Sequence, residues 1–82
     1  MSDRANEVML VVRQARLCLC GHAPEVQGAA LADLLAIWLA GHVVPGDAAE
    51  TNAMREDLLQ THISMVRALI PINAAAIHGK KP

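Results

Sequence analysis

Residues 29–40 read AALADLLAIWLA, and this stretch decides the fold because eleven of its twelve residues are apolar. Asp33 is the single exception, and the surrounding residues 17–54 contain no Lys or Arg. Helix-forming residues dominate the stretch, and a helix that is apolar on most sides must be covered on more than one of them. The stretch therefore predicts a central helix that is covered by its own chain or by a second copy.

The composition favours self-association. The 82 residues are enough for one domain, and 54% of them are hydrophobic while 18% are charged. A chain of this size buries about 60–65% of its unfolded surface when it folds alone. Because a monomer would expose a sizeable apolar patch, we expect a homo-oligomer, with a different protein as the alternative partner.

The charge distribution argues against nucleic acid as a partner. The net charge is −1, and no block of the sequence is basic enough to follow a phosphate backbone. A recognition helix over residues 24–40 would present Glu25, Gln27 and Asp33 and no basic side chain. Such a helix would be repelled from the grooves of DNA, so we expect no nucleic-acid binding.

We expect no membrane segment and a cytoplasmic location. Residues 26–46 are long enough to cross a bilayer, but the central Asp33 costs about 2.5–3.5 kcal/mol on insertion. Arg13 and Arg16 interrupt the first apolar run, which argues against a signal peptide. Cys18 and Cys20 are too few and too close together for a disulfide framework, which fits a reducing compartment.

Caps and prolines divide the chain into helices. We predict helices over residues 3–20, 24–41 and 47 to about 69. Their N-terminal residues are Ser2 or Asp3 as the first cap, Pro24 as the first residue of the second helix, and Asp47 as the third cap. Glu50 follows Asp47 at capping-box spacing, and Gly21 suits the end of the first helix.

Pro71 is expected to end the third helix, because a proline disfavours helical backbone at the residue before it. Residues 72–78 then form a further short helix or a kinked continuation. The predicted fold is all-α: a small antiparallel three-helix bundle with a short fourth C-terminal helix after Pro71, dimeric. A single helical domain covers residues 1–79, and residues 80–82 form a flexible tail.

Helical periodicity separates covered from solvated faces. The second helix carries a bulky stripe, which consists of Leu31, Leu34, Leu35, Trp38 and Leu39. The third helix carries a stripe made of Met54, Leu58, Met65, Leu69 and Ile72, opposite the polar residues Glu56, Gln60, Ser64 and Arg67. The expected interface between copies lies mainly on the second helix and consists of Leu10, Leu17, Ala36, Ile37, Trp38 and Ala40.

The histidines and cysteines include one possible metal-binding group, and it has few ligands. His22 and His42 each follow a glycine at a predicted helix end, where capping is the simpler role. Cys18 and His22 are the metal-ligand candidates, but a zinc site needs three or four ligands in one place. We therefore expect no metal and no cofactor. A helical ligand- or metal-binding module that uses His62, Asp33 and His22 is the alternative hypothesis.

Arg55 and His62 are the candidate catalytic residues, and they lie on one face of the third helix with six residues between them. This Arg–His pair resembles the active-site pattern of HEPN-type ribonucleases, in which four to six residues separate the two. The resemblance would imply a minimal ribonuclease, but the chain is short for that fold and we assign it to no family. The simpler role for His62 is a half-buried histidine bonded to a backbone or carboxylate partner such as Asp33, so we do not expect an enzyme.

Overall fold

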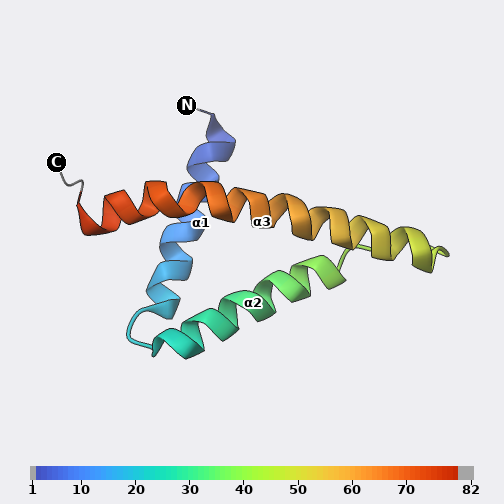
Figure 1. The fold of residues 1–82 in the computed structure, drawn as a ribbon, viewed down its shortest axis with the longest axis horizontal. Helices are drawn as coiled ribbons and strands as arrows, with labels where there is room; N and C mark the ends of the chain where they lie inside the picture. Colours follow the sequence, from blue (N-terminus) through green and yellow to red (C-terminus); the bar gives the residue numbers. More distant parts are fainter. Residues whose placement is uncertain (1, 80–82) are drawn as a thin grey trace. The chain divides into compact units, whose positions relative to one another are not determined.

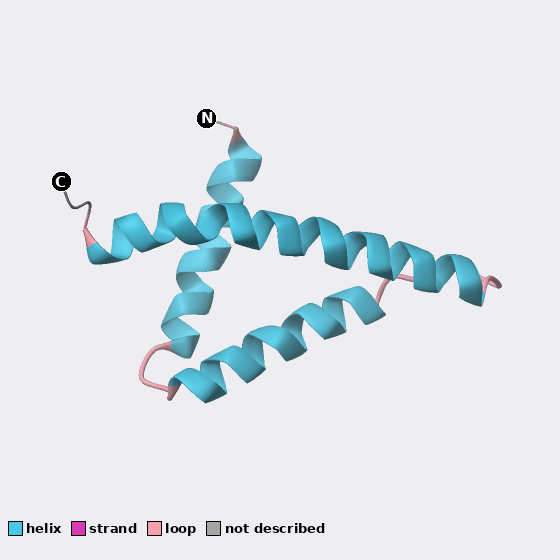
Figure 2. Ribbon diagram, in the orientation of Figure 1, coloured by secondary structure: helices cyan, strands magenta, loops and turns pink. Residues whose placement is uncertain are grey.

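The computed structural model describes residues 2–79, and this part of the chain contains three α-helices and no strands (Figures 1 and 2). Helix α1 spans Asp3–Leu19, α2 spans Pro24–Ala40 and α3 spans Ala48–His78. The predicted all-α class is confirmed. The predicted tail at residues 80–82 lies outside the described residues.

The helix ends are set by the local signals that the sequence predicted. The Ser2 hydroxyl caps α1 by accepting a hydrogen bond from the backbone N–H of Ala5 at 3.1 Å. Gly21 follows α1 with a φ of +86°, a backbone conformation that L side chains rarely adopt. A carboxylate oxygen of Asp47 caps α3 by accepting from the backbone N–H of Glu50 at 2.9 Å.

Helix α3 continues through Pro71, so the prediction of a break near Leu69 with a separate fourth helix is wrong, and of the two alternatives for residues 72–78 the structure shows a continuation of the helix. A proline removes one helical N–H and crowds the carbonyl four residues earlier, at a cost of about 3 kcal/mol. The residues that follow include Ala74, Ala75 and Ala76, which are the strongest helix formers and favour continuation. The helix ends instead at Gly79, where φ is +75°.

The chain divides into two compact units, Met1–Leu34 and Leu35–Pro82, and the division falls within α2. The first unit contains α1 and the beginning of α2. The second unit contains the end of α2, the connection over residues 41–47, and α3. The predicted bundle packing and the single domain over residues 1–79 stay predictions.

Thr51, which is 7% exposed, is the one buried residue in the described part of the chain. No hydrophobic residue in that part is buried. The expected covered stripe of α2 is therefore only partly realised: Leu35 and Leu39 are partly buried, whereas Leu31 and Leu34 are exposed. In the second unit, the partly buried apolar side chains other than Ala75 lie where the end of α2 meets α3. They are Leu35, Leu39, Val44, Met54, Leu58, Leu59 and Ile63.

Candidate functional site

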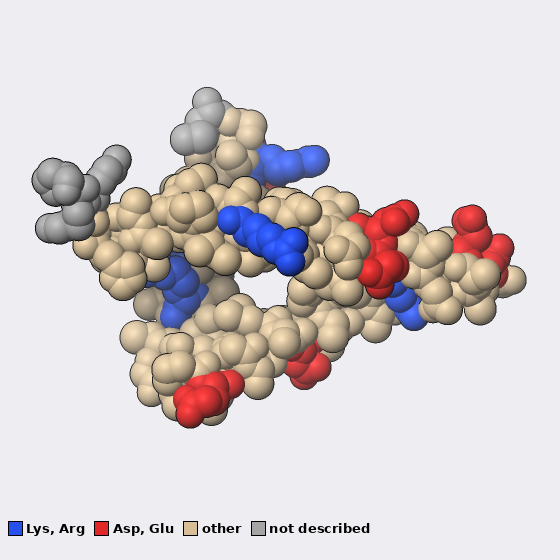
Figure 3. All heavy atoms as spheres, in the orientation of Figure 1, with Lys and Arg blue, Asp and Glu red and all other residues tan. Residues whose placement is uncertain are grey.

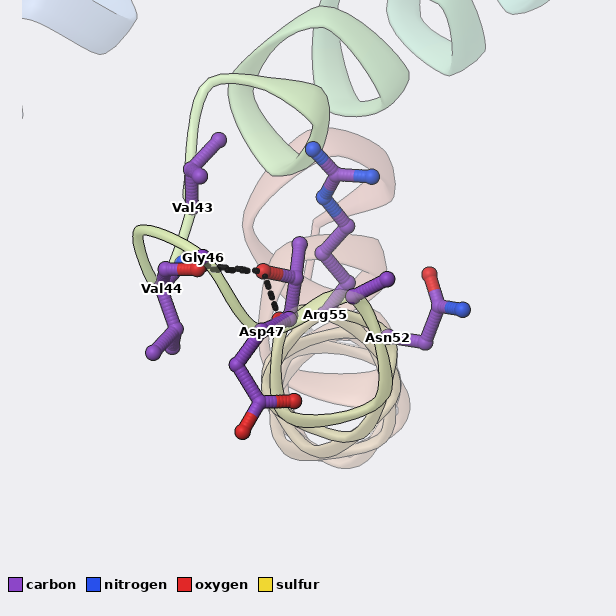
Figure 4. Close-up of a pocket in the computed structure, with 8 residues that line it drawn as sticks. Val43, Val44, Gly46, Asp47, Asn52 and Arg55 are labelled. Carbon is purple, nitrogen blue, oxygen red and sulfur yellow. Dashed lines mark hydrogen bonds between the residues drawn. The ribbon is translucent and has the colours of Figure 1, made fainter.

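The buried hydroxyl of Thr51 holds the connection between α2 and α3 through hydrogen bonds. The backbone N–H of Val44 donates to the Thr51 hydroxyl at 2.9 Å. The hydroxyl has one proton, and it lies 2.8 Å from the Asp47 carbonyl and 3.2 Å from the Val44 carbonyl, so it donates to one of these at a time. Figure 4 shows the connection folded back over the first turn of α3 around these bonds.

Arg55 closes the other side of the connection by capping the C-terminal end of α2. Its guanidinium donates from Nε to the His42 carbonyl at 3.0 Å and from Nη2 to the Ala40 carbonyl at 2.8 Å. The last carbonyls of a helix have no intrahelical partner and form the negative end of the helix dipole, so a cation bonded there is stabilising. Arg55 extends from α3 toward the end of α2 in Figure 4.

Trp38 and two histidines form an aromatic cluster at the same junction. The rings of His42 and His62 each meet Trp38 edge-to-face, with centroids 4.7 Å and 4.9 Å from the Trp38 ring. His42 Nδ1 lies 2.8 Å from the Trp38 carbonyl, and His62 Nδ1 lies 2.7 Å from the Leu58 carbonyl. Because a carbonyl only accepts, each Nδ1 carries a proton and donates, and the tautomer that fits this bond has its lone pair at Nε2.

The candidate catalytic residues, Arg55 and His62, stabilise the junction between α2 and α3. The Arg55 guanidinium is bonded to two main-chain carbonyls, and the His62 ring is placed between the Leu58 carbonyl and Trp38. Both side chains are partly buried. These contacts give Arg55 and His62 structural roles that require no substrate.

The metal-ligand candidates lie in the first unit and are exposed. Cys18 and Cys20 are free thiols, and His22 and Asp33 are exposed as well. Among residues 2–79, no three His, Cys, Asp or Glu side chains lie close enough together to hold a metal ion. Gln27, which the sequence did not single out, links the two helices of this unit by donating from Nε2 to the Leu19 carbonyl at 2.8 Å.

The predicted interface residues are all exposed. Leu10 is 57% exposed, Leu17 is 72% and Ile37 is 62%, while Trp38 is 43% exposed despite its two ring contacts. Ala36 and Ala40 are also exposed. Figure 3 shows one face of the molecule, on which the acidic and basic side chains form separate patches. Each of the predicted interface residues is accessible to solvent.

At least two hollows lie in the described part of the second unit. One lies beside the connection, opens widely to solvent, and is lined by residues that include Val43, Asn52 and Arg55 (Figure 4). The other is a shallow apolar groove on the far half of α3. It is lined by Val66, Leu69, Ile70, Asn73, Ala74, Ile77 and His78. The sequence indicated Leu69 as part of a covered stripe, but it is 45% exposed, and the groove was not expected.

No family model, curated protein or solved structure matches the chain. None of the helices in the described part of the chain combines the length and the hydropathy that are needed to span a bilayer.

Proposed function

We propose that this protein is a small cytoplasmic helical interaction protein that self-associates, or binds a protein partner, through apolar helix faces. The observation that carries the proposal is the absence of any buried hydrophobic residue among residues 2–79, together with eighteen large hydrophobic side chains that are exposed. Exposed apolar surface of this extent is typical of surfaces that bind protein.

The distribution of the exposed side chains supports the same proposal. Nine of the eighteen large exposed hydrophobic side chains lie in the first unit and nine lie in the second. Each unit therefore presents apolar surface of its own to a partner. Covering this surface would supply the hydrophobic free energy that the separate chain lacks.

No single neighbouring helix can cover α1. Residues 8–12 are five consecutive large apolar side chains, and Val8, Met9, Leu10, Val11 and Val12 are each more than half exposed. Successive residues point about 100° apart around a helix, so these five occupy its whole circumference. Packing against one neighbour leaves the opposite side bare, which favours a second copy as an additional partner.

Sedimentation velocity of the full chain tests the proposal. We expect a mass of at least twice 8.7 kDa at micromolar concentration, falling toward the mass of one chain on dilution. A single species of one chain at all concentrations, without binding of an apolar dye, would contradict the proposal.

A second candidate function is a helical ligand- or metal-binding module, and the cluster of Trp38, His42 and His62 favours it. Two imidazoles with Nε2 lone pairs flank one indole, and a backbone carbonyl holds each Nδ1, as is usual for metal-ligating histidines. A zinc ion would need one or two further ligands, which a second copy would have to supply. Titration of the untagged protein with Zn²⁺, followed by Trp38 emission, tests it: unchanged emission in the wild-type protein rejects the module.

A further inference from the structure

The stripe of α3 that meets α2 continues well beyond the residues that α2 covers. Arg55, Leu59 and His62 are partly buried, and two of them contact α2: Arg55 bonds the Ala40 carbonyl, and His62 meets the Trp38 ring. The same line of the helix then carries Val66 and Leu69, which are exposed. The spacing alternates between four and three residues, which is the repeat of a helix–helix seam.

The uncovered continuation of this stripe is called the distal seam here, and it consists of Val66, Leu69, Ile70, Asn73 and Ile77. Its four apolar members are between 45% and 68% exposed, and all five line the groove on α3. Within the second unit, the end of α2 packs against the proximal half of α3. No other residues of this unit cover the distal seam in its described part.

We propose that the distal seam pairs with the distal seam of a second copy of this chain, with the two α3 helices antiparallel. This inference rests on the proposed self-association and names the surface that carries it. The apolar side chains of the distal seam are about half exposed or more, so a second helix laid along the groove would remove apolar area from water on both copies.

The antiparallel orientation follows from the position of α2. Residues 35–40 occupy the proximal part of the stripe, so two parallel α3 helices would bring both α2 ends into the same space. Antiparallel helices avoid this, because residues 35–40 of each copy then lie beyond the end of the other copy's distal seam. Val66 of one copy faces Ile77 of the second copy in this arrangement.

The chemistry of the distal seam suits an identical partner. Asn73 is its one polar member. In this register it lies opposite Ile70 of the second copy and less than one turn along the seam from the Asn73 of that copy, and its amide, which both donates and accepts, suits the same amide near the two-fold axis. A polar residue among apolar ones in such a seam restricts the register and the number of helices. No charged residue belongs to the distal seam, so two copies meet without repulsion between like charges.

The test compares Ile70→Asp with Ile72→Asp in the full chain. The two isoleucines are 58% and 63% exposed and two residues apart, but they point to different sides of α3, and only Ile70 belongs to the distal seam. We expect Ile70→Asp to raise the dissociation constant of the dimer at least about tenfold and Ile72→Asp to change it less than about threefold. Circular dichroism verifies that both variants remain helical.

Crosslinking tests the orientation in a chain with Cys18→Ser and Cys20→Ser, which removes the two exposed thiols. Mixing the Val66→Cys and Ile77→Cys chains should give a disulfide-linked heterodimer on mild oxidation, and Val66→Cys alone should give little. Efficient linkage of Val66→Cys with itself would overturn the antiparallel arrangement.

The outcomes separate this inference from the proposed function. If the wild-type protein associates and Ile70→Asp associates equally well, the distal seam is not the interface, while self-association stands. If Ile70→Asp lowers the unfolding midpoint without changing the mass of the assembly, the chain's own residues cover the distal seam and the inference fails. A wild-type monomer overturns both.

Discussion

Replacing Thr51 with valine should loosen the connection between α2 and α3 without changing the shape of the side chain. Thr51→Val exchanges the hydroxyl for a methyl group at a position that is 7% exposed. The variant loses the acceptor of the Val44 N–H bond and the donor to the Asp47 carbonyl. Threonine and valine have similar helix propensities, so the two hydrogen bonds account for nearly all of the difference.

The magnitude follows from those two bonds. A neutral hydrogen bond contributes a net of about 0.5–1.5 kcal/mol, and an unpaired buried group costs somewhat more. Val44 is only partly buried, so water can reach part of its backbone and reduce the penalty. We expect Thr51→Val to lower the free energy of unfolding by about 1–2 kcal/mol, or about 4–8 °C in Tm for each kcal/mol.

Urea unfolding followed by circular dichroism measures this difference, with all proteins at one concentration because association would shift the midpoint. Thr61→Val is the matched control, since Thr61 lies on the same helix and is exposed. The control should change the free energy of unfolding by less than about 0.5 kcal/mol. Equal stability of the two variants would refute the role assigned to the buried hydroxyl.

Two further substitutions test other contacts in α3. Arg55→Met keeps the aliphatic stem of the side chain but removes both hydrogen bonds to the end of α2. It should lower the free energy of unfolding by about 1–2 kcal/mol. Arg67→Met, at an exposed position of the same helix, should change that free energy little. Pro71→Ala should raise the free energy of unfolding by about 1–3 kcal/mol, because alanine restores the missing backbone N–H within a continuous helix. A lower free energy of unfolding, measured by urea unfolding, would mean that Pro71 stabilises the folded protein.

Local signals in the sequence predicted the helix starts. Ser2, Pro24 and Asp47 act on residues within one turn of themselves, so their roles could be read without knowledge of the fold. The separate fourth helix was predicted wrongly because Pro71 was given more weight than the alanines that follow it, which favour continuation of the helix.

The roles of Thr51 and Trp38 required the fold. The Thr51 hydroxyl bonds Val44 and Asp47 only because the connection folds back over the start of α3. Trp38 was expected within a covered stripe, but its two histidine neighbours come from the connection after α2 and from the middle of α3. A contact between residues that are distant in sequence follows from how helices pair, which periodicity alone does not determine.

The central claim is that the apolar helix faces of this chain are covered by another chain when it is folded. The most direct measurement is the urea midpoint as a function of protein concentration. If folding and dimerisation are coupled, raising the concentration a hundredfold should raise the free energy of unfolding by about 2.7 kcal/mol and shift the midpoint upward. A midpoint that stays constant over that range, for a cooperatively unfolding helical protein, would contradict the claim.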